Sequence, residues 1–252
     1  MPDGPIALQM YSVSQLTERD MIGTLERIAE IGYSAVELAG YGNSTAPQIR
    51  ATLDRLHMRA LASHLELPDV EARPSETVND LSELGCEYGV IAWLDPSLYP
   101  TEAVARNTVD RLKRAADLLG DAGLKFAYHN HDFEFSPLGV TTLWDILLAS
   151  TDPGMMKLEV DVHWVRHSGR IPAELISELG SRVALIHAKD TWPSGSGRDG
   201  PIGEGIEDWP AVIAAARSAG VNGYIVEQEH PSDTLPDLAH SLNSLRRLLA
   251  AA

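Results

Sequence analysis

Four segments of this chain end in side chains that can bind a divalent metal ion. The apolar stretch KFAYH, which begins at Lys125, runs into His129, His131 and Glu134. Three later apolar runs each stop at one residue of the same kind, namely Asp161 in KLEVD, His187 in VALIH and Glu227 in YIVE. Carboxylates and imidazoles without a thiolate suit Mn, Co, Zn, Fe or Mg better than a structural zinc site. The pattern therefore predicts one divalent metal ion, whose identity the residues leave open.

Apolar runs that alternate with segments of helical periodicity predict parallel strands joined by crossover helices. The runs are residues 6–10, 34–38, 58–63, 88–93, 124–129, 156–160, 183–187 and 224–227. The helical segments are 20–31, 46–56, 102–119, 142–149, 172–179, 209–218 and 235–249. Eight strands in 252 residues are typical of a (β/α)8 TIM barrel of the α/β class, here one domain over residues 1–252. The alternative, a doubly wound open sheet, is disfavoured because no glycine-rich phosphate motif follows the first strand.

The barrel predicts where the metal-type residues meet. Active sites in this fold lie at the C-terminal ends of the strands, so the four segments should share one mouth. Alternation along the fifth strand puts His129 and His131 on the same side, and Glu134 follows in a predicted loop that can fold back over the mouth. Glu159 lies two residues before Asp161, where a buried carboxylate is costly unless it is paired. Position favours Asp161 as the ligand, with Glu159 in contact with its partners.

Further residues near the mouth are candidates for contact with a substrate. Trp164 offers a flat face for a sugar ring, or a wall that excludes water. Glu229 should point to the same side as Glu227, which lies deeper and is therefore the preferred ligand. Lys189 can polarise a carbonyl or hold a proton, although with Asp190 it could instead form a surface ion pair.

Two segments near the mouth are predicted to be loops. His163 and His167 follow the sixth strand and are expected to be ordinary surface residues. The stretch after Asp190, TWPSGSGRDGPIGEGIEDW, is rich in Gly and Ser and long for a barrel connection. Such a connection predicts a functional lid.

Composition narrows the classes of partner. The chain has 36 acidic and 20 basic residues, a formal net charge of −16, and no clustered Lys and Arg of the kind that binds nucleic acid. No apolar stretch approaches the length of a membrane span, so no membrane partner is expected. The N-terminal sequence lacks a secretory signal pattern, and the single cysteine, Cys86, cannot form an internal disulfide. These features predict a cytoplasmic protein.

The motifs resemble those of the xylose-isomerase-like barrels, which include sugar phosphate isomerases or epimerases, ketose 3-epimerases, inosose dehydratases and AP-endonuclease-type nucleases. The resemblance covers nearly the whole chain and rests on LQMYSV, VELAGYG, YHNHDFEF, HAKD, GEGIEDW and IVEQE, and on Asp161 followed by Trp164 and a glycine. YHNHDFEF, and HAKD together with GEG, are the more specific motifs. The resemblance implies one divalent ion held by Glu, Asp, His and Glu from strands five to eight.

Carried over, the last three of these ligands match Asp161, His187 and Glu227. The position of the first glutamate holds His129 instead, so either His129 binds the ion or Glu134 reaches in. We favour Glu134, with His129 close by, because a second carboxylate pair keeps the divalent charge compensated. The further His and Asp ligands of the nuclease members cannot all be placed in this sequence.

The resemblance implies metal-dependent isomerisation or epimerisation of a small sugar or keto-sugar, by proton abstraction next to a carbonyl through an enediolate. The candidate proton carriers are His131, Glu134 and Lys189, and the candidate substrate-binding residues are Glu37, His64, Trp164 and Glu229. A lyase or dehydratase acting on an inosose or a 3-keto-glycoside shares the first step and stays open. The alternative from another class is a non-catalytic sugar-binding barrel. Barrels of this kind commonly form dimers or tetramers, so a homo-oligomer is compatible with the sequence.

Overall fold

The computed structural model describes residues 4–193, 197–230 and 234–252. Its barrel strands are β1 (Ile6–Gln9), β2 (Ala35–Leu38), β3 (Arg59–Leu65), β4 (Tyr88–Ile91), β5 (Lys125–His129), β8 (Lys157–Asp161), β9 (Val183–Ala188) and β12 (Gly223–Val226). They close in the order β1-β12-β9-β8-β5-β4-β3-β2, and every neighbouring pair is parallel. The predicted single-domain (β/α)8 barrel is confirmed.

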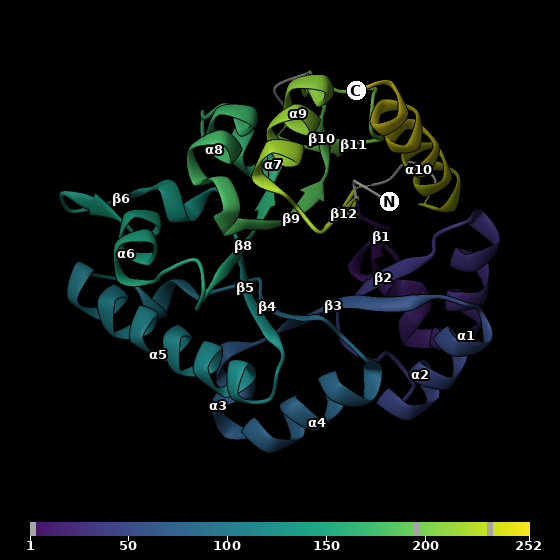
Figure 1. The fold of residues 1–252 in the computed structure, drawn as a ribbon, viewed down its shortest axis with the longest axis horizontal. Coiled ribbons are helices and arrows are strands. Elements are labelled where there is room, and N and C mark those ends of the chain that lie inside the picture. The colour runs from purple at the N-terminus through teal and green to yellow at the C-terminus, as the bar shows by residue number, and fades with distance from the viewer. Residues whose placement is uncertain (1–3, 194–196, 231–233) are drawn as a thin grey trace.

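Helices form a ring around the strands (Figure 1). They are α1 (Ser14–Ile31), α2 (Ala46–Arg55), α3 (Leu67–Ala72), α4 (Pro74–Leu84), α5 (Glu102–Asp121), α6 (Leu143–Ser150), α7 (Val162–His167), α8 (Pro172–Leu179), α9 (Trp209–Ala219) and α10 (Thr234–Ala251). The sequence did not predict α3, α4 or α7. The first two each carry a proline in the first turn, and α7 begins where the Asp161 side chain caps it by accepting the backbone N–H of Trp164 at 2.9 Å.

Side chains that point into the barrel form layers, because they alternate along each strand. Tyr128 packs in the outer core between strands and helices, whereas Ala127 belongs to a smaller cluster inside the barrel. This inner cluster comprises Ala7, Ala35, Leu61, Ala62, Tyr88, Val90, Ala127, Ala184, Leu185 and Ile225. The next layer lies two residues further along five of these strands and is polar, with Gln9, Glu37, His129, His187 and Glu227. The interior of the barrel is therefore apolar at the level of the inner cluster and polar at the C-terminal ends of the strands.

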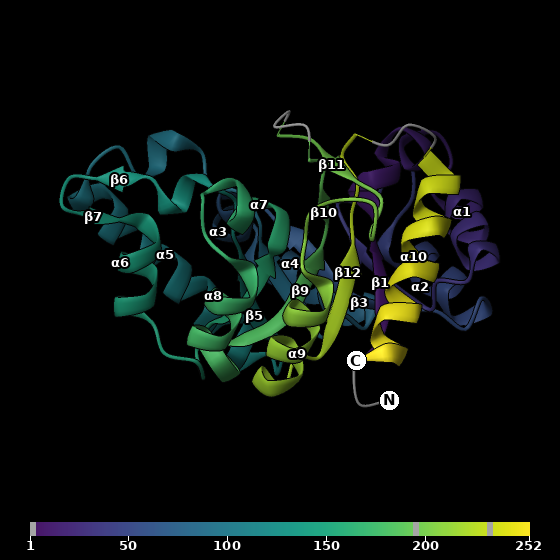
Figure 2. The same ribbon diagram turned by 90° about the horizontal axis from the view of Figure 1, so that it is seen from above.

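A small antiparallel hairpin of β10 (Asp190–Thr191) and β11 (Asp199–Gly200) extends beyond β9. Figure 2 shows this hairpin at the opposite end of the molecule from the C-terminal end of α10. The hairpin lies within the predicted lid, part of which (residues 194–196) is outside the described residues. Among the described residues, no helix combines the length and apolar character that a membrane span requires.

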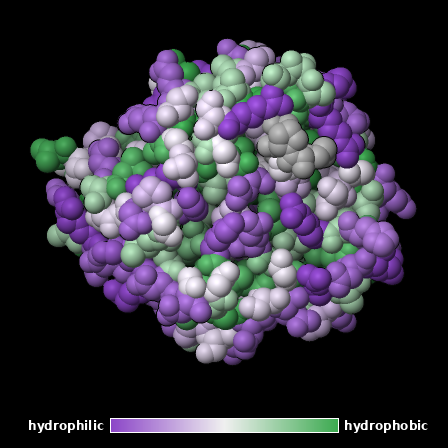
Figure 3. Space-filling view, in the orientation of Figure 1, coloured by the Kyte–Doolittle hydropathy of each residue, from purple (hydrophilic) through white to green (hydrophobic). Residues whose placement is uncertain are grey.

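A second hairpin, β6 (Pro137–Leu138) and β7 (Thr141–Thr142), projects at the left of Figure 1. Its turn carries Val140, which is fully exposed, and the tip is apolar in the space-filling view, whereas much of the rest of this face is hydrophilic (Figure 3). The hydrophilic covering agrees with the acidic composition.

Candidate metal centre

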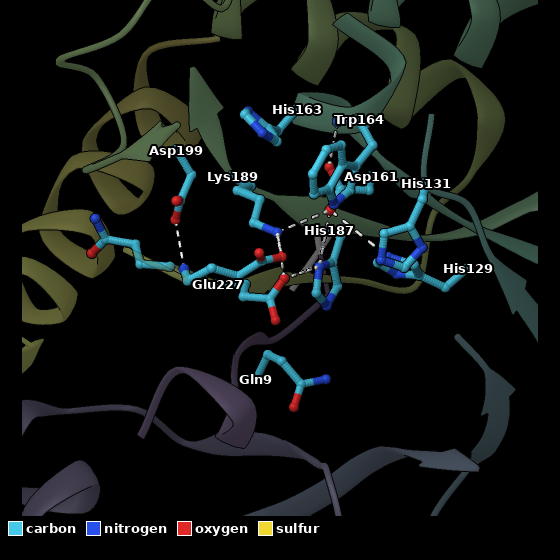
Figure 4. Close-up of polar contacts among 12 residues, drawn as sticks. Gln9, His129, His131, Asp161, His163, Trp164, His187, Lys189, Asp199 and Glu227 are labelled. Carbon is cyan, nitrogen blue, oxygen red and sulfur yellow. Dashed lines mark hydrogen bonds and ion pairs between the residues drawn. The ribbon is translucent and has the colours of Figure 1, made fainter. Parts of the chain in front are cut away.

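Three of the predicted ligands converge at the mouth of the barrel. Asp161 ends β8, His187 lies near the end of β9, and Glu227 directly follows β12. Nδ1 of His187 is 3.5 Å from Oδ2 of Asp161 and 3.3 Å from Oε2 of Glu227. The potential ligand atoms of these three residues all lie within 4.8 Å of one another, and all three side chains are buried. Figure 4 shows them pointing toward one another.

Two atoms of this group fit a metal ion because they are buried and have no hydrogen-bond partner. These are Nδ1 of His187 and Oδ2 of Asp161. A buried polar atom without a partner is energetically unfavourable, and native proteins contain few of them. A cation between His187, Asp161 and Glu227 would satisfy both atoms and neutralise the two carboxylates. The donor set therefore fits a divalent ion.

The structure places His129, and not Glu134, beside these ligands. Nε2 of His129 is 3.8 Å from Oδ2 of Asp161. Glu134 is buried in a short 3-10 turn and both of its oxygens are engaged elsewhere: Oε1 accepts the Tyr128 hydroxyl at 2.7 Å, and Oε2 accepts the backbone N–H of His131 at 2.9 Å. Because Tyr128 points to the outside of the barrel, it holds Glu134 away from the ligand group. Our preference for Glu134 as the fourth ligand is not supported by this position.

A second layer of carboxylates orients the two histidines. Nδ1 of His129 lies 2.9 Å from Oε1 of Glu159, and Nε2 of His187 lies 3.1 Å from Oε2 of Glu37. Histidines that bind metal ions usually donate their second ring N–H to such a carboxylate, which fixes the tautomer. His64 lies between the two carboxylates, with Nε2 at 3.1 Å from Glu37 and 3.3 Å from Glu159. Both histidines therefore direct their other ring nitrogen toward the ligand group.

The charge states of His129 and Glu37 agree with that arrangement. At His187 burial opposes the charge of the ring, but Glu227 and Glu159 raise its pKa well above the usual range, so a metal ion that binds there must displace a proton. Burial, together with the neighbouring His187, lowers the pKa of His129 to about 3, so its imidazole is neutral and can bind a metal ion. Burial alone would raise the pKa of Glu37, but His64 and His187 lower it to about 2. Glu37 is thus an ionised carboxylate. It lies buried beneath His187, where the sequence had suggested a substrate-binding residue.

Replacing Glu159 by Gln tests the second layer. We expect Glu159→Gln to weaken metal binding by about 10- to 100-fold, because the amide does not hold the His129 ring as the carboxylate does. Competition with a chelator measures this affinity. Glu178→Gln, at an exposed position on α8, is the matched control. Equal affinities of the two variants would show that Glu159 does not orient a ligand.

Lys189 lies buried among carboxylates on the other side of the ligand group. Its Nζ is 2.8 Å from Oε2 of Glu227, 2.5 Å from Oε1 of Glu229 and 3.7 Å from Oδ2 of Asp161. Burial opposes the charge of the ammonium group, but the three carboxylates raise the pKa of Lys189 above its usual range. Its Nζ also lies 5.3 Å from the centre of the Trp164 ring. Lys189 is therefore a buried, charged hydrogen-bond donor and not part of a surface ion pair.

A cavity of about 950 Å³ opens above these residues. Of the predicted substrate-binding residues, His64, Trp164 and Glu229 line it. His131 also lines the cavity, and its buried Nδ1 has no hydrogen-bond partner. Burial lowers the pKa of His131 to about 4, so the ring is neutral near neutral pH. A neutral imidazole facing a cavity can accept a proton.

Asp190 holds the predicted lid in place, a role that the sequence analysis missed. Its Oδ1 accepts the backbone N–H groups of Thr191 and Glu207, at 2.9 and 3.1 Å. Its Oδ2 accepts the N–H of Gly203 at 2.8 Å and the indole N–H of Trp209 at 2.9 Å. The motifs HAKD and GEGIEDW lie at the two ends of the lid, and both ends meet at this carboxylate. This pairing of motifs was the signal in the sequence for the role of Asp190.

Two further residues tie this loop to the mouth of the barrel. Asp199 accepts the backbone N–H of Glu229 at 2.6 Å, and its other oxygen lies 2.8 Å from Nδ1 of His230. His163 is buried in α7, with Nδ1 2.9 Å from the hydroxyl of Thr191. The expectation that His163 is a surface loop residue was wrong, because α7 turns its ring toward the lid.

An eight-stranded parallel barrel with polar side chains gathered at the C-terminal ends of its strands defines a TIM barrel with an enzyme-type mouth. Residues 25–248 match the family described as the xylose isomerase-like TIM barrel, and the chain belongs to this family of enzymes. An inosose dehydratase of Geobacillus kaustophilus (strain HTA426) is 26% identical over 190 residues, which make up 66% of this chain and 60% of that relative. The chain thus matches less than two thirds of the length of this curated relative.

Solved structures share the fold over nearly the whole chain. A sugar phosphate isomerase/epimerase from Parabacteroides distasonis ATCC 8503 superposes with a TM-score of 0.83 and 22% identity, covering 97% of this chain and 98% of that one. The IOLI protein, solved with a bound zinc atom, gives a TM-score of 0.77 and 14% identity, covering 98% of both chains. At these identities the likeness shows the fold alone.

Proposed function

We propose that this protein is a divalent-metal-dependent isomerase or epimerase that acts on a small sugar or keto-sugar. The observation that carries this proposal is the convergence of two unpartnered buried atoms, Nδ1 of His187 and Oδ2 of Asp161, with Glu227. Nε2 of His129 lies 3.8 Å from the same Asp161 oxygen, and His129 and Glu227 line the open cavity. Membership in the xylose isomerase-like family and the isomerase/epimerase among its structural neighbours support it.

In this proposal Asp161, His187, Glu227 and His129 hold the ion, in place of the Glu134 that we favoured from sequence. When bound, the ion polarises a carbonyl and stabilises the negative charge that develops on its oxygen when the neighbouring carbon loses a proton. Mn, Co, Zn, Fe and Mg all accept these ligands, and the zinc in the IOLI structure supports zinc among them.

The side chains around the ligand group supply the proton transfers. His131 is neutral and its Nδ1 has no hydrogen-bond partner, so it accepts the proton from carbon. Return of that proton by His131 to the adjacent carbon would give an isomer, whereas delivery of a proton to the opposite face by a second group would give an epimer. Lys189 donates a hydrogen bond to an oxygen of the substrate. Trp164 closes one side of this space, with its ring centre 5.4 Å from that of His131.

Dehydration is the second candidate function, and the Lys189–Glu229 pair favours it. The 2.5 Å contact places an ammonium group next to a carboxylate that also lines the cavity. Such a pair can protonate a hydroxyl group on the carbon next to the one that lost its proton. This hydroxyl group then leaves as water. The inosose dehydratase relative supports this outcome.

Deuterium exchange separates these functions. We expect a panel of ketoses and inososes, followed by NMR in deuterated water, to show metal-dependent exchange at one carbon next to the carbonyl. Exchange without loss of a group identifies an isomerase or epimerase, and loss of water identifies the dehydratase. The same protein treated with a chelator is the control. A protein that binds these sugars but exchanges no proton, with or without metal, would be a sugar-binding barrel and would refute the proposal.

A further inference from the structure

The cavity above the metal centre is larger than one sugar ring requires. Its volume of about 950 Å³ lies near the top of the range of about 300–1,000 Å³ that is typical of sites for drug-sized ligands. A monosaccharide at the ligand group would fill only the part beside His131, Trp164 and Glu227. The remainder extends to α3, α4 and the loop after β2, and we call it the outer chamber. It is lined by Tyr41, Glu66, Asp69, Arg73, Glu76 and Asp80.

Carboxylates dominate the charge of the outer chamber. Arg73 is its one Lys or Arg side chain among the described lining residues, against four carboxylates. Arg73 already pairs with Asp69 at 3.2 Å and with Glu76 at 3.7 Å. Glu76 also occupies the first turn of α4, the helix end that would otherwise attract an anion. Because a cleft lined by one sign of charge concentrates its field, the outer chamber repels a phosphate group.

An aromatic wall connects the metal centre with the rim of the cavity. The ring of His131 stacks on Phe133 with centres 5.4 Å apart, and Trp93 meets Phe133 edge-on at 5.1 Å. Trp93 remains 45% exposed, and Tyr11, which also lines the cavity, remains 56% exposed. Exposed large aromatic side chains in one concave surface mark a binding site, and their flat faces suit the C–H face of a sugar ring.

We propose that the outer chamber binds a second, uncharged sugar ring, so that the substrate is a two-ring glycoside and not a sugar phosphate. This inference rests on the proposed function, which places the reacting ring at the ligand group. The second ring stacks on Trp93, and its hydroxyl groups donate hydrogen bonds to the carboxylates that line the chamber, which accept such bonds and do not donate them. The volume, the negative charge and the aromatic wall all favour this occupant.

Binding titrations with three sugars test the proposal without requiring turnover. We expect cellobiose to bind about tenfold more tightly than glucose, since one aromatic stacking contact contributes roughly 0.5–1.5 kcal/mol and 1.4 kcal/mol is a factor of ten. Glucose 6-phosphate should bind no more tightly than glucose. Trp93→Ala should remove the advantage of cellobiose, while Ile171→Ala, an exposed apolar position absent from the cavity lining, should keep it.

A double variant tests the charge. Asp69→Asn with Glu76→Gln removes both partners of Arg73, so binding of glucose 6-phosphate should strengthen relative to glucose. Equal binding of cellobiose and glucose, no detectable binding of cellobiose, or tightest binding of glucose 6-phosphate to the unchanged protein would each overturn the two-ring proposal. Metal-dependent deuterium exchange on a monosaccharide would still stand in any of these cases, so the two proposals fail separately.

Discussion

The variant His129→Gln is expected to lower the affinity for a divalent ion by about 100-fold or more. Loss of residues that merely orient a ligand already weakens binding by about 10- to 100-fold, and His129 would be a ligand itself. Its neutral ring directs Nε2 toward Asp161 while Glu159 holds Nδ1. Metal content after dialysis and competition with a chelator measure the change.

Glu134→Gln is the matched control for this experiment, since His129 and Glu134 are the two candidates for the fourth ligand. Burial raises the pKa of Glu134 to about 8, so its charged form is disfavoured and a neutral amide of the same size is a conservative replacement. We expect Glu134→Gln to retain its metal ion. Loss of metal from Glu134→Gln with retention in His129→Gln would restore the ligand set that the sequence suggested, and would mean that the turn at Phe133–Phe135 rearranges around the ion.

The barrel could be predicted from the sequence because parallel strands that are buried on both faces appear as apolar runs. The three helices that escaped prediction are short or begin at special residues. Helix α3 has only 6 residues, and α4 buries only Leu81 and Leu84, so neither shows an apolar period long enough to detect. In α7 the first turn depends on the Asp161 side chain, whose capping role the sequence does not distinguish from that of a metal ligand.

The site could be predicted only where a strand determines it. Asp161, His187 and Glu227 follow from alternation along strands whose direction the fold fixes. The bond between His187 and Glu37 joins residues 150 positions apart and depends on how β9 and β2 face one another across the barrel. The position of Glu134 could not be predicted, because a turn, and not a strand, decides where it points.

His131→Gln is expected to reduce metal-dependent proton exchange by about 10²- to 10⁴-fold, the usual contribution of a general base. The reason is that His131 lines the cavity, its Nδ1 has no hydrogen-bond partner, and its pKa of about 4 keeps the ring in the neutral form that a base requires. Metal content should not change, since His131 does not belong to the converging ligand group of Asp161, His187 and Glu227. Deuterium exchange followed by NMR, on protein saturated with metal, gives the rate.

Two variants distinguish His131 from the other candidate proton carriers. Glu134→Gln should exchange at a rate close to that of the unchanged protein, because Glu134 lies behind His131 and outside the cavity lining. Lys189→Met should slow the reaction while still permitting some exchange, since an ammonium group stabilises charge on oxygen but does not take a proton from carbon. Full exchange in His131→Gln, with exchange lost in Glu134→Gln, would assign the base to Glu134. Because the same Glu134 variant also tests the ligand set, its metal content and its exchange rate together separate a ligand, a base and a residue that only supports the backbone of His131.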